Sequence, residues 1–159
     1  MMRSQAQVVR SSHLAATRQE VWNRISTPAG VNYEFGPLMR MTFPKHVDRL
    51  SPQDVPLGEK IGRCWILLFG IIPLDYDDLV LVSIDEGHGF HEKSKLMTQR
   101  RWEHERTITS MKAGGCVISD RLTFEPRLPL PGKLFAPIIS AVFAHRHRRL
   151  RQYFHLGRA

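Results

Sequence analysis

The segment that most constrains the fold is the last long one, residues 134–154, with the sequence LFAPIISAVFAHRHRRLRQYF. Its apolar residues recur at 134/135, 138/139, 142/143, 150 and 153/154, which is the spacing of one helical face. A helix of about 20 residues is about 30 Å long, enough to cross a small domain. Arg146 projects close to the middle of the apolar face, whereas Arg148 and Arg151 project away from it. The rest of the chain must therefore supply a surface for this helix and a partner for Arg146.

Length and composition predict a single globular domain over residues 1–159. The chain is 42% hydrophobic and 24% charged, and a chain of this size can bury most of its apolar surface. Its two cysteines, Cys64 and Cys116, form neither a disulfide framework nor a zinc-binding pattern. The first residues lack the apolar core of a signal peptide, and the longest apolar run, residues 64–74, is too short to span a bilayer. We therefore expect a cytoplasmic protein without stable membrane insertion.

The net charge of +8 is concentrated at one end of the chain. Residues 126–159 carry seven basic and no acidic residues, so the basicity belongs mainly to the terminal segment. A stripe of arginines on one helix can meet the phosphates of a nucleic acid. It can equally be the solvated side of an amphipathic helix, with cations near its negative end. We favour the second interpretation and expect no nucleic-acid partner; an interaction module or nucleic-acid binder that uses the arginine-rich helix is an alternative.

The other segments indicate one strand, two short helices and about six further strands before the long helix. Thr17 to Glu20 has the form of a capping box, which opens the first helix. Thr27-Pro28 starts a second helix that runs to about Phe35 and ends at Gly36-Pro37. Period-two patterns and turn residues predict strands at 8–14, 38–43, 61–69, 78–84, 90–97, 101–111 and 116–125.

This order predicts an α+β domain. Strands that follow one another through hairpins form an antiparallel sheet, and the long helix must cover one face of it. We therefore expect a helix-grip fold, a curved sheet of about six to seven strands wrapped around the C-terminal helix. A curved sheet and a single helix do not close perfectly, so a cavity between them is expected.

Several stretches resemble the START-like or SRPBCC helix-grip superfamily, which includes lipid-transfer, pollen-allergen-like and polyketide cyclase/dehydrase-like proteins. They are ATRQEVWNRISTPAGVNYEFGPLMRM, FHEKS, RWEHERTI, GGCVISDRLTFEP and FAHRHRRLRQYF. The W-x-H, D-x-L-x-F-x-P and H-R-H-x-x-L-x-x-x-F patterns are most similar to small bacterial SRPBCC proteins, including the domain fused to epimerase-like "cell division inhibitor" proteins. The resemblance implies a cavity for a hydrophobic ligand, and it does not imply a reaction.

Polar residues fall on the inner face of the predicted sheet. Alternation along the strands places Glu92 inward, groups Trp102 with His104 and Arg106, and sets Asp120 among apolar residues. A buried carboxylate needs a partner or takes up a proton. We therefore expect the arginines on the helix and on the sheet to meet these carboxylates in the interior.

Two interpretations of this polar set remain open. It is either a structural ion network that fixes how the helix docks, or the polar end of a cavity that anchors a ligand carboxylate, hydroxyl or carbonyl. The resemblance to the family adds two aromatic residues of the second short helix to this set of candidates, because they would line the opposite rim of the cavity. The candidate ligand-binding residues are Glu92, Trp102, His104, Arg106, Asp120, Arg146, Tyr33 and Phe35.

The favoured function is binding of a small hydrophobic or amphipathic molecule, such as a lipid, polyketide or aromatic compound. A cyclase or dehydratase in the same cavity is an alternative, because Glu92, His104 and Asp120 are suitable for general acid–base work. Without a nucleophile elbow, phosphate loop or dinucleotide fingerprint, no catalytic residue is assigned and no cofactor is expected.

Metal binding is not expected either. His88 and His91 lack a nearby third ligand in the sequence, and residues 75–78 are interpreted as a solvated strand end. The apolar hairpin at residues 68–74 is a lid, a membrane-touching tip, a dimer contact or, as favoured, a buried segment. An oligomer is therefore possible.

Overall fold

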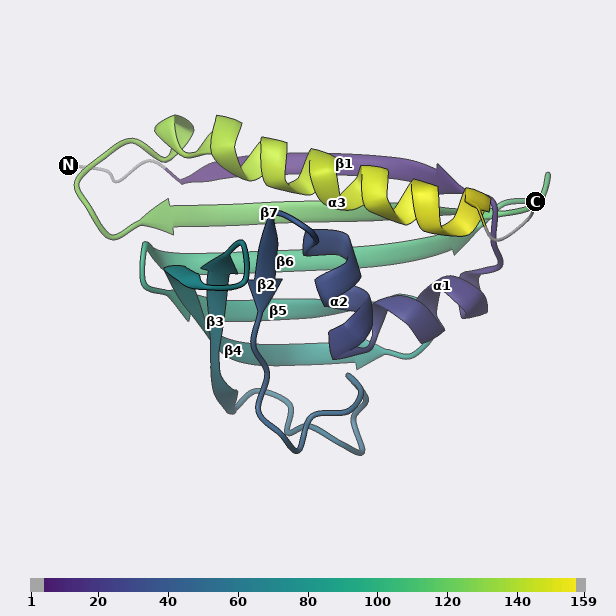
Figure 1. Cartoon of the computed structure of the whole chain (residues 1–159), viewed down its shortest axis with the longest axis horizontal. Helices are drawn as coiled ribbons and strands as arrows, with labels where there is room; N and C mark the ends of the chain where they lie inside the picture. Colours follow the sequence, from purple (N-terminus) through teal and green to yellow (C-terminus); the bar gives the residue numbers. More distant parts are fainter. Residues whose placement is uncertain (1–4, 157–159) are drawn as a thin grey trace.

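The computed structural model describes residues 5–156 and contains one antiparallel sheet of seven strands in the order β1-β7-β6-β5-β4-β3-β2 (Figure 1). The strands are β1 Ala6–Leu14, β2 Met39–Met41, β3 Lys60–Leu68, β4 Ile72–Asp85, β5 Gly89–Leu96, β6 Gln99–Ser110 and β7 Cys116–Pro126. The helices are α1 Arg18–Ile25, α2 Pro28–Phe35 and α3 Ala136–Leu156, with a 3-10 turn, η1, at Gly132–Leu134. The predicted α+β fold, a curved antiparallel sheet with a C-terminal helix, is confirmed.

The two short helices begin where their caps predict. The Thr17 hydroxyl accepts a hydrogen bond from the Glu20 backbone N–H, and the Glu20 carboxylate accepts one from the Thr17 backbone N–H at 2.7 Å. The Thr27 hydroxyl likewise accepts from the Gly30 backbone N–H. A Cβ atom at Gly30 would collide with the carbonyl of Arg24, so glycine here lets α2 pack closely on the end of α1.

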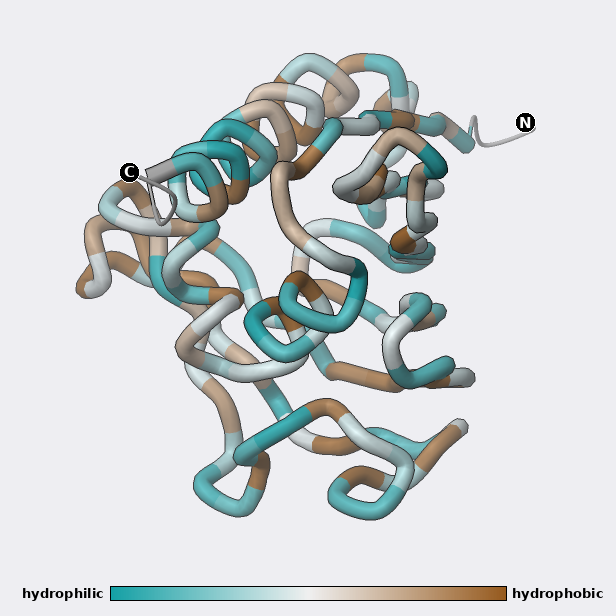
Figure 2. Tube along the Cα trace, turned by 90° about the vertical axis from the view of Figure 1, so that its right-hand side faces the viewer, coloured by the Kyte–Doolittle hydropathy of each residue, from teal (hydrophilic) through white to brown (hydrophobic). Residues whose placement is uncertain are grey.

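The long helix α3 packs against β1 and α2 and runs over the sheet (Figure 1). Pro137 is the second residue of α3, where its missing N–H removes no intrahelical hydrogen bond. The first half of α3 is mostly apolar, whereas its second half alternates polar residues with buried apolar ones (Figure 2). Of its buried residues, Phe143 packs in one part of the core, whereas Leu150 and Phe154 pack together in another.

The largest difference from the prediction lies in β4, which begins at Ile72 rather than at residue 78. Asp75 continues the strand because its carboxylate accepts hydrogen bonds from the backbone N–H groups of Met97 and Thr98. β4 therefore extends into the turn after β3, and Asp77 lies inside a strand. The interpretation of residues 75–78 as a solvated strand end is wrong for Asp77, which is 4% exposed.

The hairpin between β3 and β4 is exposed, contrary to the favoured prediction of burial. Phe69 is 62% exposed and Ile71 is 76% exposed. Leu74, at the base of the hairpin, lines the internal cavity described below. The hairpin therefore adjoins the cavity while its tip carries exposed apolar side chains.

Candidate functional site

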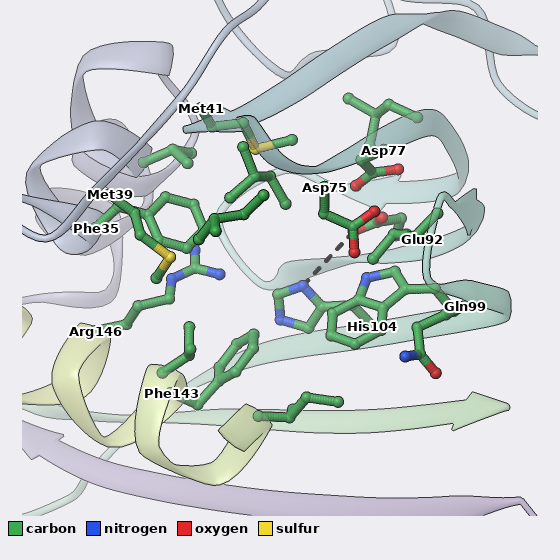
Figure 3. A pocket seen from close by; sticks show the side chains of 18 of the residues that line it. Phe35, Met39, Met41, Asp75, Asp77, Glu92, Gln99, His104, Phe143 and Arg146 are labelled. Atoms are coloured by element: carbon green, nitrogen blue, oxygen red, sulfur yellow. Dashed lines mark ion pairs between the residues drawn. The ribbon is translucent and has the colours of Figure 1, made fainter. Parts of the chain in front are cut away.

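A cavity of about 340 Å³ lies between the inner face of the sheet, α2 and α3 (Figure 3). Pockets that hold small molecules typically have volumes of about 300–1,000 Å³. Its walls are mostly apolar and include six aromatic side chains. These are Phe35, Phe43, Phe90, Trp102, Phe135 and Phe143. The cavity can therefore enclose the apolar body of a small molecule.

The polar groups of the lining fall into two sets that lie on different sides of the cavity (Figure 3). Arg146 projects from α3 on one side, close to Phe35 and Phe143. On the other side, residues of β4, β5 and β6 bring together a group of acids, an amide and an imidazole. That group consists of Asp75, Asp77, Glu92, Gln99 and His104.

The partner of Arg146 is Glu34, a fully buried residue of α2. The Glu34 Oε1 atom lies 3.2 Å from Nε and 3.1 Å from Nη2 of Arg146. The guanidinium carbon also lies 4.5 Å from the ring centre of Phe35 and 4.9 Å from that of Phe143. The predicted direct pairing of Arg146 with Asp120 or Glu92 is wrong, because α2 places the Glu34 carboxylate between the helix and the sheet.

Arg106 connects Glu34 to Asp120 behind the cavity wall. It donates to Glu34 through Nη1 at 3.0 Å and Nη2 at 2.8 Å, and to Asp120 through Nε at 2.7 Å and Nη2 at 2.8 Å. Asp120 also lies 2.7 Å from Nε2 of His104 and 2.7 Å from Nε2 of His147. Each oxygen of Asp120 thus has two nitrogen partners, which is about the full capacity of a carboxylate.

Burial and charge act in opposite directions on these carboxylates. Burial alone would raise the pKa of Asp120, but the Arg106 charge and the hydrogen bonds from Arg106 and His104 hold it well below its ordinary value. Burial also opposes ionisation of Glu34, yet Arg106 and Arg146 lower its pKa. Two guanidinium groups therefore balance two ionised carboxylates, and this network joins α2, β6, β7 and α3.

On the other side of the cavity, Asp77 lacks such compensation. Burial and the neighbouring Glu92 raise the pKa of Asp77 well above its ordinary value. Burial would also raise the pKa of Glu92, but hydrogen bonding and charge from His104, with a hydrogen bond to Asp77, lower it. The His104 Nδ1 atom lies 3.6 Å from the Glu92 Oε2 atom. Asp77 is therefore the acid of this pair that takes up a proton more readily, and His104 lies beside Glu92.

The sequence-predicted residues divide into two groups in the structure. Those that line the cavity are Phe35, Glu92, Trp102, His104 and Arg146. Arg106 and Asp120 lie behind the wall in the ion network. Tyr33 does not lie on the predicted rim; its ring packs 5.1 Å from the ring of Tyr153 and lies under the guanidinium of Arg149, at 4.1 Å.

Several residues of the site or its support were missed, although the sequence contains a signal for two of them. Glu34 follows Val31 by three positions and precedes Phe35, so it falls on the buried face of its helix. Asp77 has the same strand parity as Leu79 and Leu81 and therefore faces inward once the strand is extended to include it. Gln99 begins β6, where the sequence pattern predicts a turn.

The basic residues on the exposed side of α3 contact other elements of the same chain. Arg149 donates to the Tyr33 carbonyl at 3.1 Å, and Arg151 donates to the Ser12 hydroxyl at 2.8 Å. These contacts tie α3 to α2 and β1. Within residues 5–156, no helix is long and apolar enough to cross a membrane.

The described residues also contain a possible metal-ligand cluster on the opposite side of the sheet, formed by His91, Glu103 and Glu105. Their ligand atoms lie within 4.8 Å of one another. Arg101 forms an ion pair with Glu103 at 2.9 Å, and Arg121 forms one with Glu105 at 3.6 Å. Side-chain cations therefore already balance these carboxylates.

Comparison with known proteins places this arrangement in a family. The sequence profile of a domain of unknown function, DUF8410, matches residues 12–154. The chain belongs to the DUF8410 family. No curated protein matches its sequence.

Solved structures share the fold of this DUF8410 protein at low sequence identity. A protein from Chromobacterium violaceum is 11% identical with a TM-score of 0.70, and a START superfamily protein from Mycobacterium smegmatis is 11% identical with a TM-score of 0.66. Each match covers 94% of this chain and 97% of the other. DynU16, a protein from the dynemicin biosynthetic locus, is 15% identical with a TM-score of 0.63, covering 95% of this chain and 48% of DynU16. The START-like fold predicted from the sequence is confirmed.

Proposed function

We propose that this DUF8410 protein binds a small hydrophobic or amphipathic molecule in the cavity between the sheet and α3. The observation that carries the proposal is the 340 Å³ space itself, walled by aromatic and aliphatic side chains with polar groups at defined places. Protein interiors are normally close-packed, so apolar space of this size is typical of a ligand site. Lipids, polyketides and other aromatic compounds fit this lining, and the START-like fold supports the same class of ligand.

Native mass spectrometry of the purified protein and titration with the neutral fluorescent dye N-phenyl-1-naphthylamine test the proposal. A bound small molecule, or saturable dye fluorescence, is expected from the wild type. Val142→Phe adds a ring to the cavity wall and should abolish dye binding while the protein stays folded. Val9→Phe, at a position 59% exposed, is the matched control and should bind dye normally. Equal dye binding by both variants would contradict an internal site.

A cyclase or dehydratase acting in the same cavity is the second candidate. The observation that favours it is the Asp77–Glu92 pair beside His104, because a proton-sharing pair next to an imidazole can donate and accept protons on one ligand. If the cavity is catalytic, the wild type and Glu92→Gln should co-purify with molecules of different mass. Identical masses would favour binding without chemistry.

The proposal also includes a cytoplasmic location without a nucleic-acid partner. The free, buried thiols of Cys64 and Cys116 support a reducing compartment. The contacts of Arg149 and Arg151 with α2 and β1 support a structural role for the basic side of α3. Salt-sensitive binding to duplex DNA that is lost in the Arg148→Ala/Arg151→Ala double variant would contradict this part of the proposal.

A further inference from the structure

Three buried oxygen atoms at the acidic side of the cavity receive no hydrogen bond from the described residues. They are Asp77 Oδ1, Glu92 Oε1 and Gln99 Oε1. The three residues are 4%, 6% and 3% exposed, respectively, and all three line the cavity. A buried acceptor without a donor is costly, and native proteins rarely keep several together. A group rich in hydrogen-bond donors would satisfy them.

The charges around the cavity indicate the sign of that group. The positive charge of Arg146 is already paired with Glu34 and enclosed by two aromatic rings. Asp77 and Glu92 together retain one negative charge when they share a proton, and Asp75 adds a further carboxylate to the lining. His104 compensates part of this negative charge, and the remaining carboxylates favour a cation over an anion inside a protein of net charge +8.

We propose that the cavity selects a ligand with a protonated amine on an apolar body, and that the ammonium group binds at Asp77 and Glu92. This inference rests on the proposed function and names its ligand class. An alkylammonium can donate N–H groups to the unpaired oxygens of both acids, and its charge takes over the role of a proton shared by them. Trp102, which lines the same cavity from β6, offers an aromatic face that also favours a cation.

The site differs from a chance cluster of surface acids because the strands that carry its residues are hydrogen-bonded to one another within the sheet. Asp77 lies on β4 and Glu92 on β5, which are adjacent strands of the sheet. His104 lies opposite Glu92 in the β5–β6 register, and its Nε2 atom is held by Asp120 at 2.7 Å. The structural ion network thus positions the imidazole that flanks the proposed ammonium site.

Competition for bound N-phenyl-1-naphthylamine at pH 7 by octylamine, octan-1-ol and octanoate tests the proposal, since these probes differ only in their polar group. Octylamine should displace the dye at a concentration about tenfold or more below that of octan-1-ol, because hydrogen bonds to charged groups are the stronger ones. Octanoate should be weaker than both. In Glu92→Gln the advantage of octylamine over octan-1-ol should fall to about twofold or less, since the charge is removed.

Two further variants make the result decisive. Asp77→Asn places N–H donors where the ligand's donors should lie, so this variant should also remove the preference for octylamine. If Glu92→Gln fails to fold, Asp77→Asn serves as the test in its place. Glu103→Gln alters a carboxylate of β6 that does not line the cavity and should keep the preference. Equal displacement by octylamine and octan-1-ol in the wild type would overturn this inference and leave the proposed function intact. Failure of the dye and all three probes to bind would overturn the proposed function and this inference with it.

Discussion

At the scale of single residues, the interior contains two pairs of buried carboxylates that differ in how fully their oxygens are hydrogen-bonded. Glu34 and Asp120 are ionised, and nitrogen donors occupy their oxygens. Asp77 and Glu92 face the cavity with one unpaired oxygen each. A completed network favours a structural role, whereas an incomplete one is typical of a site that a ligand completes. The structure therefore divides one predicted polar set into a docking network and a ligand-facing group.

Removal of the Glu34 charge should destabilise the fold strongly. Glu34→Gln leaves the guanidinium groups of Arg106 and Arg146 buried without their shared counter-charge. Breaking a buried ion pair by removing one partner typically costs about 3–5 kcal/mol. Urea unfolding followed by circular dichroism should show a loss of this size. The same change at Glu103, whose charged partners Arg101 and Lys93 are exposed on the outer face, should cost about 1 kcal/mol or less. Equal losses at both positions would show that the network contributes little.

Asp77→Asn should stabilise the unliganded protein at neutral pH. The pKa of Asp77 is higher in the folded protein than in the unfolded chain, where it is about 3.9. The contribution of Asp77 to stability is therefore fully present below about pH 3.9, and it is lost as the pH rises through the folded pKa. Asparagine does not titrate, so the variant should gain on the wild type as the pH rises from about 4 towards 7. The groups that surround Asp77 are Glu92 and Ser94 on β5, Asp75 on its own strand, Cys64 on β3, His104 on β6 and, across the cavity, Arg146 on α3.

The adjacent residue provides a control of opposite sign for this titration. Asp78 faces the other side of β4. A hydrogen bond from Arg63 and an ion pair with Lys60 lower the pKa of Asp78 to about 2, although its partial burial acts in the opposite direction. Its contribution is present above the unfolded pKa of about 3.9 and is lost as the pH falls through about 2. Asp78→Asn should therefore lose stability relative to the wild type as the pH rises from about 3 to 6. Parallel curves for the two variants would contradict both assignments.

At the scale of elements, the turn between β3 and β4 carries an avoidable strain. Phe69 has φ 52° and Gly70 has φ 77°, and the Ile71 N–H donates to the Leu68 carbonyl at 3.1 Å to close the turn. A left-handed conformation costs a non-glycine residue about 1–2 kcal/mol. Two successive positive φ angles are typical of a type I′ turn, for which Asn-Gly is the favoured pair. Phe-Gly at this place is therefore not optimal for the hairpin.

Phe69→Asn should raise the free energy of unfolding by up to about 1 kcal/mol, because asparagine enters the left-handed region more readily. The exposed phenylalanine ring loses little, since it is 62% exposed. Ile71→Asn, at a neighbouring position that is 76% exposed and has no positive φ, controls for polarity and should bring no such gain. Chemical denaturation of both variants measures the difference. A loss of stability in Phe69→Asn would indicate that the ring makes a contact worth more than the strain.

Helices and strands were predictable from the sequence wherever a short local pattern determines where they begin or which side faces inward. The capping box at Thr17, the Thr27-Pro28 start and the period of α3 are encoded within a few residues, and the helices begin close to the positions they predict. The inward parity of His104 and Asp120 was equally local. The partner of Arg146 was not, because the choice between Glu34 and Asp120 depends on how α2 docks, which no local pattern specifies.

At the scale of the whole molecule, an acidic site lies inside a protein of net charge +8. The acids of the cavity come from β4 and β5, whereas the basic residues of α3 contact α2 and β1. A surface charge is screened by salt, with a Debye length of about 10 Å at 0.1 M and about 3 Å at 1 M, whereas a buried pair is screened much less. Salt can therefore distinguish an ammonium inside the cavity from one adsorbed on the outer carboxylates.

Octylamine should raise the thermal midpoint of the wild type in a manner that survives salt. At about 100 times its dissociation constant, a ligand that binds only the folded state adds about 2.7 kcal/mol. For a chain of this length each 1 kcal/mol shifts the midpoint by roughly 2–4 °C, so the expected rise is roughly 5–10 °C. The rise should be similar at about 0.05 and 0.5 M sodium chloride, because the ammonium is buried. It should be smaller in Val142→Phe, whose added ring occupies part of the cavity, and unchanged in Val9→Phe. A rise that vanishes at high salt in the wild type would mean that the amine binds to the surface, and the acids inside would then need another partner.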